Sequence, residues 1–463
     1  MARPEDATDI WRILLFGQCG AELLLLRSPS GFRLPELCVP RGQRVAPNLN
    51  AAAKRLWNLD TVCLLPLNVS PDDLAAVETK YHVMELCRPE DLARVAPDFT
   101  QMSAVKEDSF SDARDYLAVQ KGMRLEGVDL AVNAIGPFSQ CGSFERISAW
   151  VEEQLRPLGI RLESNFRQLQ ATASFALIRF DTDRGAVWFK AVGDPNLREY
   201  SITGSLTTRL PQYVPELLAA KADWNAWLTA EAQGQGLFES SDPATWCRAA
   251  EFLAKLQIAS IQHTTDLLAA GAHDVRAHKL LNMVSPFFAV MQEIMQAQTK
   301  TTVPKLTKQE ICSVAELVTE TLHKFAEAGI PNTLNHLDLN PCNVIVSASG
   351  CTFLDWAEAA VGNPLFSLEY LRQEFLKVFP GQSESQRDFV NAYVNRCKPI
   401  LADTITADLM QLVPLAAAFV FAASALPWDD PKVCRRPELS AFLRSLVRHM
   451  QREAEQIRTD RAA

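Results

Sequence analysis

Short apolar runs separated by turn residues fill the first ninety residues of the chain. Runs such as IWRILLF, TVCLLPL and YHVMEL alternate with stretches rich in Pro, Gly and Asn, while LNAAAKRLWNL has the spacing of an amphipathic helix. This mixture predicts a small α+β domain over residues 1–95. Residues 96–137 are charged and mixed in composition, so we expect a connector that contains a helix.

A second pattern begins near residue 138. The helix-spaced segment GPFSQCGSFERISAWVEEQLRPLG precedes three strand-like runs, LESNFRQLQ, FALIRF and AVWFKAV, which are separated by the turns ATAS and DTDRG. A helical segment, LREYSITGSLTTRLP, is followed by the strand-like runs VPELLAA and DWNAWLTAE and by a loop, AQGQGL. Beyond residue 244 nearly every segment has helical spacing, except residues 334–356. The order predicts a small sheet-rich lobe, residues 138–236, and a large helical lobe, residues 237–463.

Composition narrows the class of protein. The chain has 463 residues, more than one ordinary core accommodates, and a net charge of −9 without a Lys/Arg block, so we expect no nucleic-acid partner. The run LVPLAAAFVFAASALPW predicts a buried core helix rather than a membrane span. Eleven scattered cysteines and an acidic N-terminus favour reduced thiols in the cytoplasm. Residues 263–278 contain three histidines, but their spacing predicts a solvated helix end and no metal site. The oligomeric state is left open.

A lysine lies in the middle of an apolar strand. Lys190 is flanked by large hydrophobic residues in AVWFKAV, and the following helix has Glu199 in its first turn. An isolated strand lysine usually faces solvent. A strand lysine held by a helix glutamate is, however, the arrangement that binds the α and β phosphates of ATP, and we favour this interpretation for Lys190 and Glu199.

The segment LNHLDLNPCNVIVSASGCTFLDW, residues 334–356, places polar side chains between strand-like runs. Asp338 and Asn343 lie on a loop that Pro341 keeps out of a helix, and Asp355 follows a strand hairpin. The hairpin would bring the Asn343 amide and the Asp355 carboxylate close enough to share one Mg²⁺ ion, which prefers oxygen ligands. Asp338 is then left to accept the proton of a hydroxyl nucleophile, and we expect His336 to brace the loop.

Together these residues resemble a known signature. The string His336, Asp338, Asn343 and Asp355 looks like the H-x-D-x-x-x-x-N and following D-F/W pattern of protein-kinase-like phosphotransferases, especially the aminoglycoside phosphotransferase and choline kinase branch. WFK, LREYSITGSLTTRLPQYVPELL and WAEAAVGNPLFSLEYL are similar to further segments of that branch. The resemblance covers about residues 140–455.

The resemblance implies a bilobal, protein-kinase-like α+β fold and an enzyme that uses ATP and Mg²⁺. It implies Lys190 on the phosphates, Glu199 as the partner of Lys190, Asp338 as the catalytic base with His336 in the same loop, and Asn343 and Asp355 on Mg²⁺. The backbone near Glu231 would lie against adenine. The acceptor would be a hydroxyl of a small molecule such as an amino sugar or an amino alcohol.

Two departures keep a second interpretation open. The position after His336, commonly glycine in the family, is Leu337, which requires ordinary backbone angles. The turn ATAS, expected to cover the phosphates with Ser174, contains no glycine.

The first domain has a resemblance of its own. The segment GQRVAPNLNAAAKRLWNL resembles the loop and helix of a Nudix domain, but this helix has no acid to hold magnesium. The alternative is therefore a catalytically inactive, kinase-shaped binding or scaffold protein.

Overall fold

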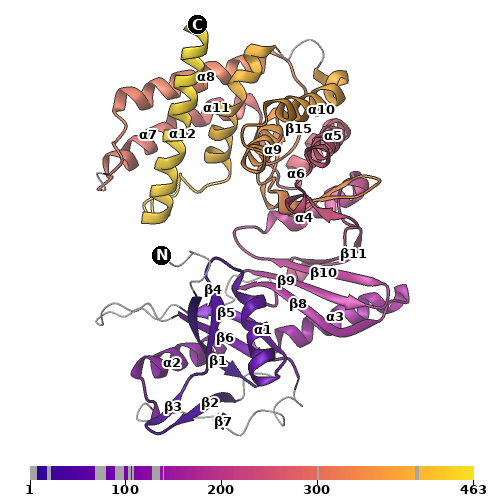
Figure 1. Ribbon diagram of the computed structural model, residues 1–463, viewed down its shortest axis with the longest axis vertical. Coiled ribbons are helices and arrows are strands. Elements are labelled where there is room, and N and C mark those ends of the chain that lie inside the picture. Colours follow the sequence, from indigo (N-terminus) through magenta and orange to yellow (C-terminus); the bar gives the residue numbers. More distant parts are fainter. Residues whose placement is uncertain are drawn as a thin grey trace. The chain divides into compact units, whose positions relative to one another are not determined.

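The computed structural model describes residues 8–17, 22–67, 80–88, 99–102, 106, 109–127, 136–138, 140–299, 302–401 and 406–462. Parts of the predicted connector, including residues 128–135, lie outside these ranges. Contacts divide the chain into two compact units, residues 1–200 with 216–231, and residues 201–215 with 232–463. Figure 1 labels many of the elements of both units.

The first sheet of the N-terminal unit has apolar residues on both faces. In β1, Ile13 and Leu15 belong to one core, whereas Leu14 and Phe16 belong to another, because side chains alternate along a strand. Both faces are buried, which explains the uninterrupted apolar runs of the sequence. The strands are β1 (Thr8–Phe16), β2 (Leu23–Ser28), β3 (Gly31–Arg33), β4 (Glu36–Pro40), β5 (Thr61–Leu67), β6 (Lys80–Leu86) and β7 (Phe99–Met102), and the helices are α1 (Val45–Trp57) and α2 (Ala113–Gly127).

These strands follow the order β3-β2-β1-β6-β5, while β4 pairs with β1 and β7 pairs with β2. Only the β1–β6 pairing is parallel among the described strand pairs of this sheet. From residues 96–137, β7 is part of this sheet and α2 packs against β1 and β5. The likeness to a Nudix domain stays a prediction.

The second sheet of the N-terminal unit carries Lys190. Its order is β11-β12-β10-β9-β8, and all its pairings are antiparallel. One face packs against α3, whose buried residues Ile147, Trp150 and Val151 share a core with Phe189 of β10. The elements are α3 (Ser143–Leu155), β8 (Leu162–Thr172), β9 (Phe175–Thr182), β10 (Gly185–Val192), β11 (Leu217–Lys221) and β12 (Ala226–Ala230), together with the first residues of α4 (Arg198–Arg209), most of which belongs to the second unit.

Helices dominate the second unit, which has one extensive hydrophobic cluster. Its helices are α5 (Pro243–Ser260), α6 (Thr264–Ala269), α7 (Ala277–Gln296), α8 (Lys308–Glu327), α9 (Leu365–Val378), α10 (Ser383–Leu401), α11 (Ala407–Ser424) and α12 (Pro437–Ala462). Its strands are β13 (Gln235–Gly236), β14 (His273–Val275), β15 (Thr333–His336), β16 (Val344–Val346), β17 (Cys351–Phe353) and β18 (Ala359–Gly362). The predicted α+β class, with sheets followed by helices, is confirmed.

The most apolar helix of this unit lies in its core. α11 is long and apolar enough to cross a membrane, with a mean hydropathy of 1.6, but 56% of it is buried inside the protein. Its buried residues, which include Phe419 and Val420, belong to the same cluster as those of α7, α8, α9 and α12. The expectation of a buried core helix agrees with this packing.

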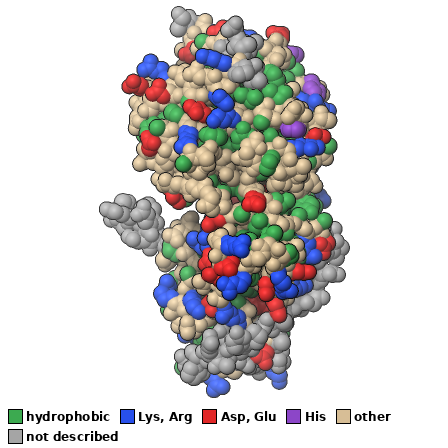
Figure 2. Space-filling view, turned by 90° about the vertical axis from the view of Figure 1, so that its right-hand side faces the viewer, with side chains coloured by type: hydrophobic (Ala, Val, Ile, Leu, Met, Phe, Trp, Pro, Cys, Tyr) green, Lys and Arg blue, Asp and Glu red, His purple; other side chains and the backbone are tan. Residues whose placement is uncertain are grey.

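Two short strands differ from the expectations. The predicted loop AQGQGL contains β13, which pairs with β16, and the predicted helix end at residues 263–278 contains β14, which pairs in parallel with β18. Each of these strands has only two or three residues and a partner far along the chain, so no local periodicity marks it. On the face shown in Figure 2, basic and acidic side chains are interspersed.

Candidate active site

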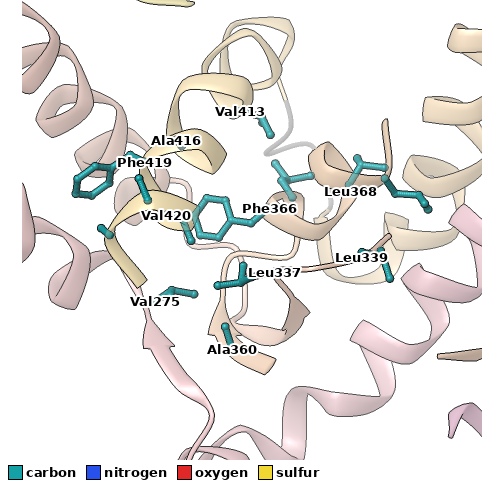
Figure 3. Packing of buried hydrophobic residues seen from close by; sticks show 14 of the residues in the cluster. Val275, Leu337, Leu339, Ala360, Phe366, Leu368, Val413, Ala416, Phe419 and Val420 are labelled. Carbon is teal, nitrogen blue, oxygen red and sulfur yellow. The ribbon is translucent and has the colours of Figure 1, made fainter. Parts of the chain in front are cut away.

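The loop that follows β15 is anchored by alternate residues. Leu337 and Leu339 are 4% and 0% exposed and lie in the core of the second unit with Phe366 and Leu368 of α9 (Figure 3). The side chain of Asp338, between them, is therefore directed away from that core. Leu337 has no left-handed backbone conformation, as expected for a residue in the place of a glycine. Packing against the core, rather than a flexible glycine, thus fixes the direction of Asp338.

His336 braces this loop. Its ring is buried and lies against Trp356, with 4.7 Å between the ring centroids. Nε2 lies 2.8 Å from the carbonyl oxygen of Leu354, and Nδ1 lies 3.3 Å from the backbone nitrogen of Asp338. Burial lowers the pKa of His336 below its ordinary value. A neutral ring that donates from Nε2 and accepts at Nδ1 satisfies both contacts.

One oxygen of Asp338 is held by a tyrosine. The Tyr370 hydroxyl, from α9, donates to Oδ1 of Asp338 at 2.9 Å. Burial and the neighbouring carboxylate raise the pKa of Tyr370, so the phenol stays protonated and remains a donor. Among the described residues, no side chain or backbone group donates to the second oxygen, Oδ2. Asp338 therefore presents one fixed and one available carboxylate oxygen.

The chain between Asp338 and Asn343 is a closed turn. Asn340 N–H donates to the Asp338 carbonyl at 2.7 Å, and Asn343 N–H donates to the Asn340 carbonyl at 2.8 Å. Pro341 is the first residue of a short 3₁₀ turn that ends at Asn343. At this first position a backbone N–H would have no partner within the turn, so the lack of an N–H in proline costs nothing. The predicted loop is therefore more regular than expected, because proline excludes an α-helix interior but fits a first helical position.

Asn343 and Asp355 are brought to one end of the β16–β17 hairpin. Leu354 N–H donates to the Asn343 carbonyl at 2.8 Å, so Asp355, the next residue, lies beside Asn343. The Asn343 side-chain nitrogen donates to the Asp338 carbonyl at 3.1 Å, which leaves its amide oxygen as the group available to a ligand. The hairpin thus places Asn343 and Asp355 beside each other, and a shared Mg²⁺ ion stays a prediction.

Asp355 has a left-handed backbone, with φ 62° and ψ 70°, and its side chain is exposed. Aspartate adopts this conformation more readily than most residues, and such strained residues concentrate at functional sites. In the part of the chain that the structure describes, no group of three His, Cys, Asp or Glu residues has the arrangement of a metal site. A cation at Asn343 and Asp355 would therefore take its other ligands from a bound molecule or from water.

Lys190 and Glu199 form a buried ion pair in the N-terminal unit. Lys190 Nζ and Glu199 Oε1 are 2.5 Å apart, and the two residues are 9% and 1% exposed. The ammonium group also lies near the rings of Phe175 and Trp227, at 5.3 and 5.6 Å from their centroids. The sequence correctly paired the two residues, and their burial is unlike that of an ordinary surface lysine.

Ser174 lies in the two-residue turn between β8 and β9. Its carbonyl accepts a hydrogen bond from Gly193 N–H at 2.6 Å. A Cβ atom at Gly193 would lie 3.0 Å from Ser174 Cβ, which is tighter than ordinary contact, so glycine favours this close approach. The glycine that packs against this turn therefore directly follows β10 and lies outside the ATAS segment.

Glu231 follows β12 and has its polar groups engaged within the unit. Its carboxylate accepts from Arg179 Nε at 2.7 Å and from Trp188 Nε1 at 3.3 Å. The Arg179 hydrogen bond lowers the pKa of Glu231. The backbone N–H of Glu231 donates to the Ala186 carbonyl at 3.0 Å. Any role beside adenine stays a prediction.

Tyr370 was not identified from the sequence. It lies 32 residues beyond Asp338, in a helix whose apolar spacing indicates only a core-facing stripe. A buried tyrosine usually has a hydrogen-bond partner for its hydroxyl, and this was the only indication in the sequence that Tyr370 contacts a polar group.

Comparisons with known proteins find a family model that matches part of the chain. Residues 194–387 match the model of the phosphotransferase enzyme family, APH. This range includes Glu199, Asp338, Asn343 and Asp355, but begins after Lys190 and Ser174. No curated protein matches the chain.

The chain is also similar to solved structures. A macrolide 2′-phosphotransferase from Brachybacterium faecium is 14% identical, with 66% of this chain and 98% of that chain covered and a TM-score of 0.44. An ethanolamine kinase from Plasmodium vivax is 11% identical, with 72% and 94% covered and a TM-score of 0.47. A choline kinase from Streptococcus pneumoniae is 13% identical, with 66% and 99% covered and a TM-score of 0.42.

Proposed function

We propose that this protein transfers the γ-phosphate of ATP to a hydroxyl of a small molecule, and the match of residues 194–387 to the model of the phosphotransferase enzyme family supports this proposal. The observation that carries the proposal is the arrangement of Asp338, Asn343 and Asp355. A base with one available oxygen lies on the same turn as an amide oxygen, and a carboxylate lies beside that amide. Phosphoryl transfer needs such positioned groups more than covalent chemistry.

In the proposed reaction, the acceptor hydroxyl donates its proton to Oδ2 of Asp338. The hydroxyl oxygen forms a bond to the γ-phosphorus as the bond between that phosphorus and the ADP oxygen breaks. Lys190, kept in place by Glu199, binds the α and β phosphates. Asn343 Oδ1 and the Asp355 carboxylate are the groups that would hold Mg²⁺, which neutralises phosphate charge when bound.

The acceptor is proposed only as a class. A net charge of −9 suits a cationic molecule, such as an amino sugar or an amino alcohol, more than an anionic one. The test is phosphate transfer from γ-labelled ATP to a panel of amines, sugars and amino acids, with Mg²⁺ present or chelated. Label in an acceptor only with Mg²⁺ supports the proposal.

A second function has one observation in its favour. The turn at Ala173 and Ser174 has no glycine of its own, and a glycine-poor turn restricts approach of the backbone to phosphate. An inactive, kinase-shaped scaffold would bind nucleotide without transferring phosphate to any member of the panel. That result would replace the enzyme proposal with the scaffold.

Tyr370 supplies a prediction about rate. In Tyr370→Phe, the ring that packs in the core is kept and the hydrogen bond to Asp338 is lost, so the carboxylate is less well oriented. We expect kcat to fall about tenfold while the KM for ATP changes little, and the loss of a hydrogen bond to a charged group, worth about 1.5–3 kcal/mol, also lowers the melting temperature. A fall in stability together with an unchanged kcat would assign Tyr370 a structural role only.

Lys190 supplies a prediction about stability. In Lys190→Met, the buried Glu199 carboxylate loses its cation, and breaking a buried pair costs about 3–5 kcal/mol. We expect a large loss in the free energy of unfolding, measured by denaturant titration, and recovery of most of it in the double variant Lys190→Met, Glu199→Gln.

The matched control is Lys324→Met. Lys324 pairs with Glu320 at 3.1 Å, but both side chains are more than 40% exposed. Exposed pairs contribute about 0–1 kcal/mol, so this variant should unfold like the wild type. Equal losses in the two single variants would contradict the buried-pair argument.

A further inference from the structure

Two sheet edges lie against each other within the N-terminal unit. β5 is the last strand in the order β3-β2-β1-β6-β5, and β8 is the last in the order β11-β12-β10-β9-β8. An edge strand leaves backbone N–H and C=O groups unpaired on its outer side. Here β8 contacts β5 and α1, so both edges are covered by the other part of the unit.

The side chain of Gln168 joins these edges. Its Oε1 accepts from the backbone N–H of Cys63 at 2.8 Å, and its Nε2 donates to the backbone carbonyl of Cys63 at 2.8 Å. The side-chain amide thus makes the two bonds that a peptide group of a neighbouring strand would make. Asn50 of α1 donates to the same Oε1 at 3.0 Å. Gln168 is 6% exposed, so these bonds are shielded from water.

A second connection lies at the start of α3. Glu85 of β6 is 2% exposed, and both of its carboxylate oxygens accept from Gly142 N–H, at 2.8 and 2.9 Å. Gly142 is the N-cap of α3, where a carboxylate stabilises the helix dipole. Phe144 and Phe166 then lie 4.3 Å apart between their ring centroids and pack against the cores of both sheets.

These connections end beside the β8–β9 turn. Gln168 lies at a break in the β8–β9 register, shortly before the turn, and Ala171 packs against the core that contains α1. The cavity between residues 62–64 and the strands leading to the turn measures about 20 Å³, about the size of one water molecule. On its other side the turn is held by Gly193. The turn is therefore supported from two directions.

We propose that the N-terminal sheet positions the β8–β9 turn for nucleotide, and that Gln168 is the positioning residue through which it does so. This inference rests on the proposed function, because it assigns the turn containing Ser174 to the phosphates. Holding this turn in the binding conformation removes the free-energy cost of ordering it when nucleotide binds.

The test compares two glutamines of one strand. Gln168→Leu removes the amide that bonds Cys63, whereas Gln170→Leu makes the same chemical change at a half-buried residue nearer the turn that has no side-chain hydrogen bond among the described contacts. Each full-length variant is studied by hydrogen–deuterium exchange of the peptide covering residues 169–176, and by calorimetric titration with MgATP well below the melting temperature.

We expect Gln168→Leu to exchange faster in this peptide and to raise the Kd for MgATP about tenfold, with Gln170→Leu within about twofold of the wild type. Should Gln168→Leu fail to fold, Asn50→Ala removes one donor to the same amide and should shift both readouts in the same direction. Equal exchange and equal Kd in the Gln168 variant and its control would overturn the inference. Absence of ATP binding by the wild type would instead overturn the proposed function, and with it the role assigned to the turn.

Discussion

Asp338→Asn is expected to lower the rate of phosphate transfer about 10³-fold, within the range usual for loss of a general base. Asparagine has nearly the same shape and can still accept from Tyr370, so the loop anchored by Leu337 and Leu339 should persist. Its neutral amide cannot take the proton of the acceptor hydroxyl. The Kd for MgATP, measured by calorimetry, should stay within about twofold, because Asp338 is not assigned to nucleotide.

The control for this variant is Asp388→Asn. Asp388 lies on α10 of the same unit and is exposed, so the same change in charge occurs away from the candidate base. Its kcat should equal that of the wild type with the best acceptor in the panel. If Asp338→Asn turned over at the wild-type rate, Asp338 would have no place in the mechanism.

Asp355→Asn is expected to abolish the part of ATP binding that depends on Mg²⁺. Asparagine tolerates the left-handed backbone that Asp355 adopts, with φ 62°, so this change tests the charge without adding the strain that alanine would introduce. The wild type at 100 times its Kd for MgATP should be stabilised by about 2.7 kcal/mol, and the variant by far less.

Thermal unfolding with ATP, in the presence of Mg²⁺ or of a chelator, measures this effect. The wild type should melt higher only with both components, and the variant should melt alike in all conditions. A shift of equal size in both proteins would show that Asp355 does not hold the cation. No shift in either would favour the scaffold and direct the search toward protein partners.

Local patterns predicted most of the elements around the site. The hairpin β9–β10, helices α3 and α4, and the turn from Asp338 to Asn343 all have strong short-range signals, namely alternation, helical spacing or proline. The family resemblance is confirmed over residues 194–387. It rested on several residues at fixed spacing, which is more specific than any one motif.

Contacts between distant segments could not be predicted in this way. Tyr370 reaches Asp338 only because α9 packs beneath the loop, and Gln168 reaches Cys63 across 105 residues of sequence. A buried glutamine in a strand has no periodicity that distinguishes it from a surface glutamine. The role of such a residue can be recognised only in the structure, where its side chain is seen to bond the unpaired backbone groups of an edge strand.

The anchoring of Asp338 by its leucine neighbours also has a consequence for how this protein can evolve. Leu337 shares a core with Phe366 and Phe419, which are assigned no contact with a ligand (Figure 3). We therefore expect substitutions in this core to change the position of Asp338 as well as the stability of the fold. The side chains of this core affect both the stability of the fold and the rate of phosphate transfer. We therefore expect the core to change slowly in evolution and new acceptor preferences to arise from substitutions on the surface of the helices.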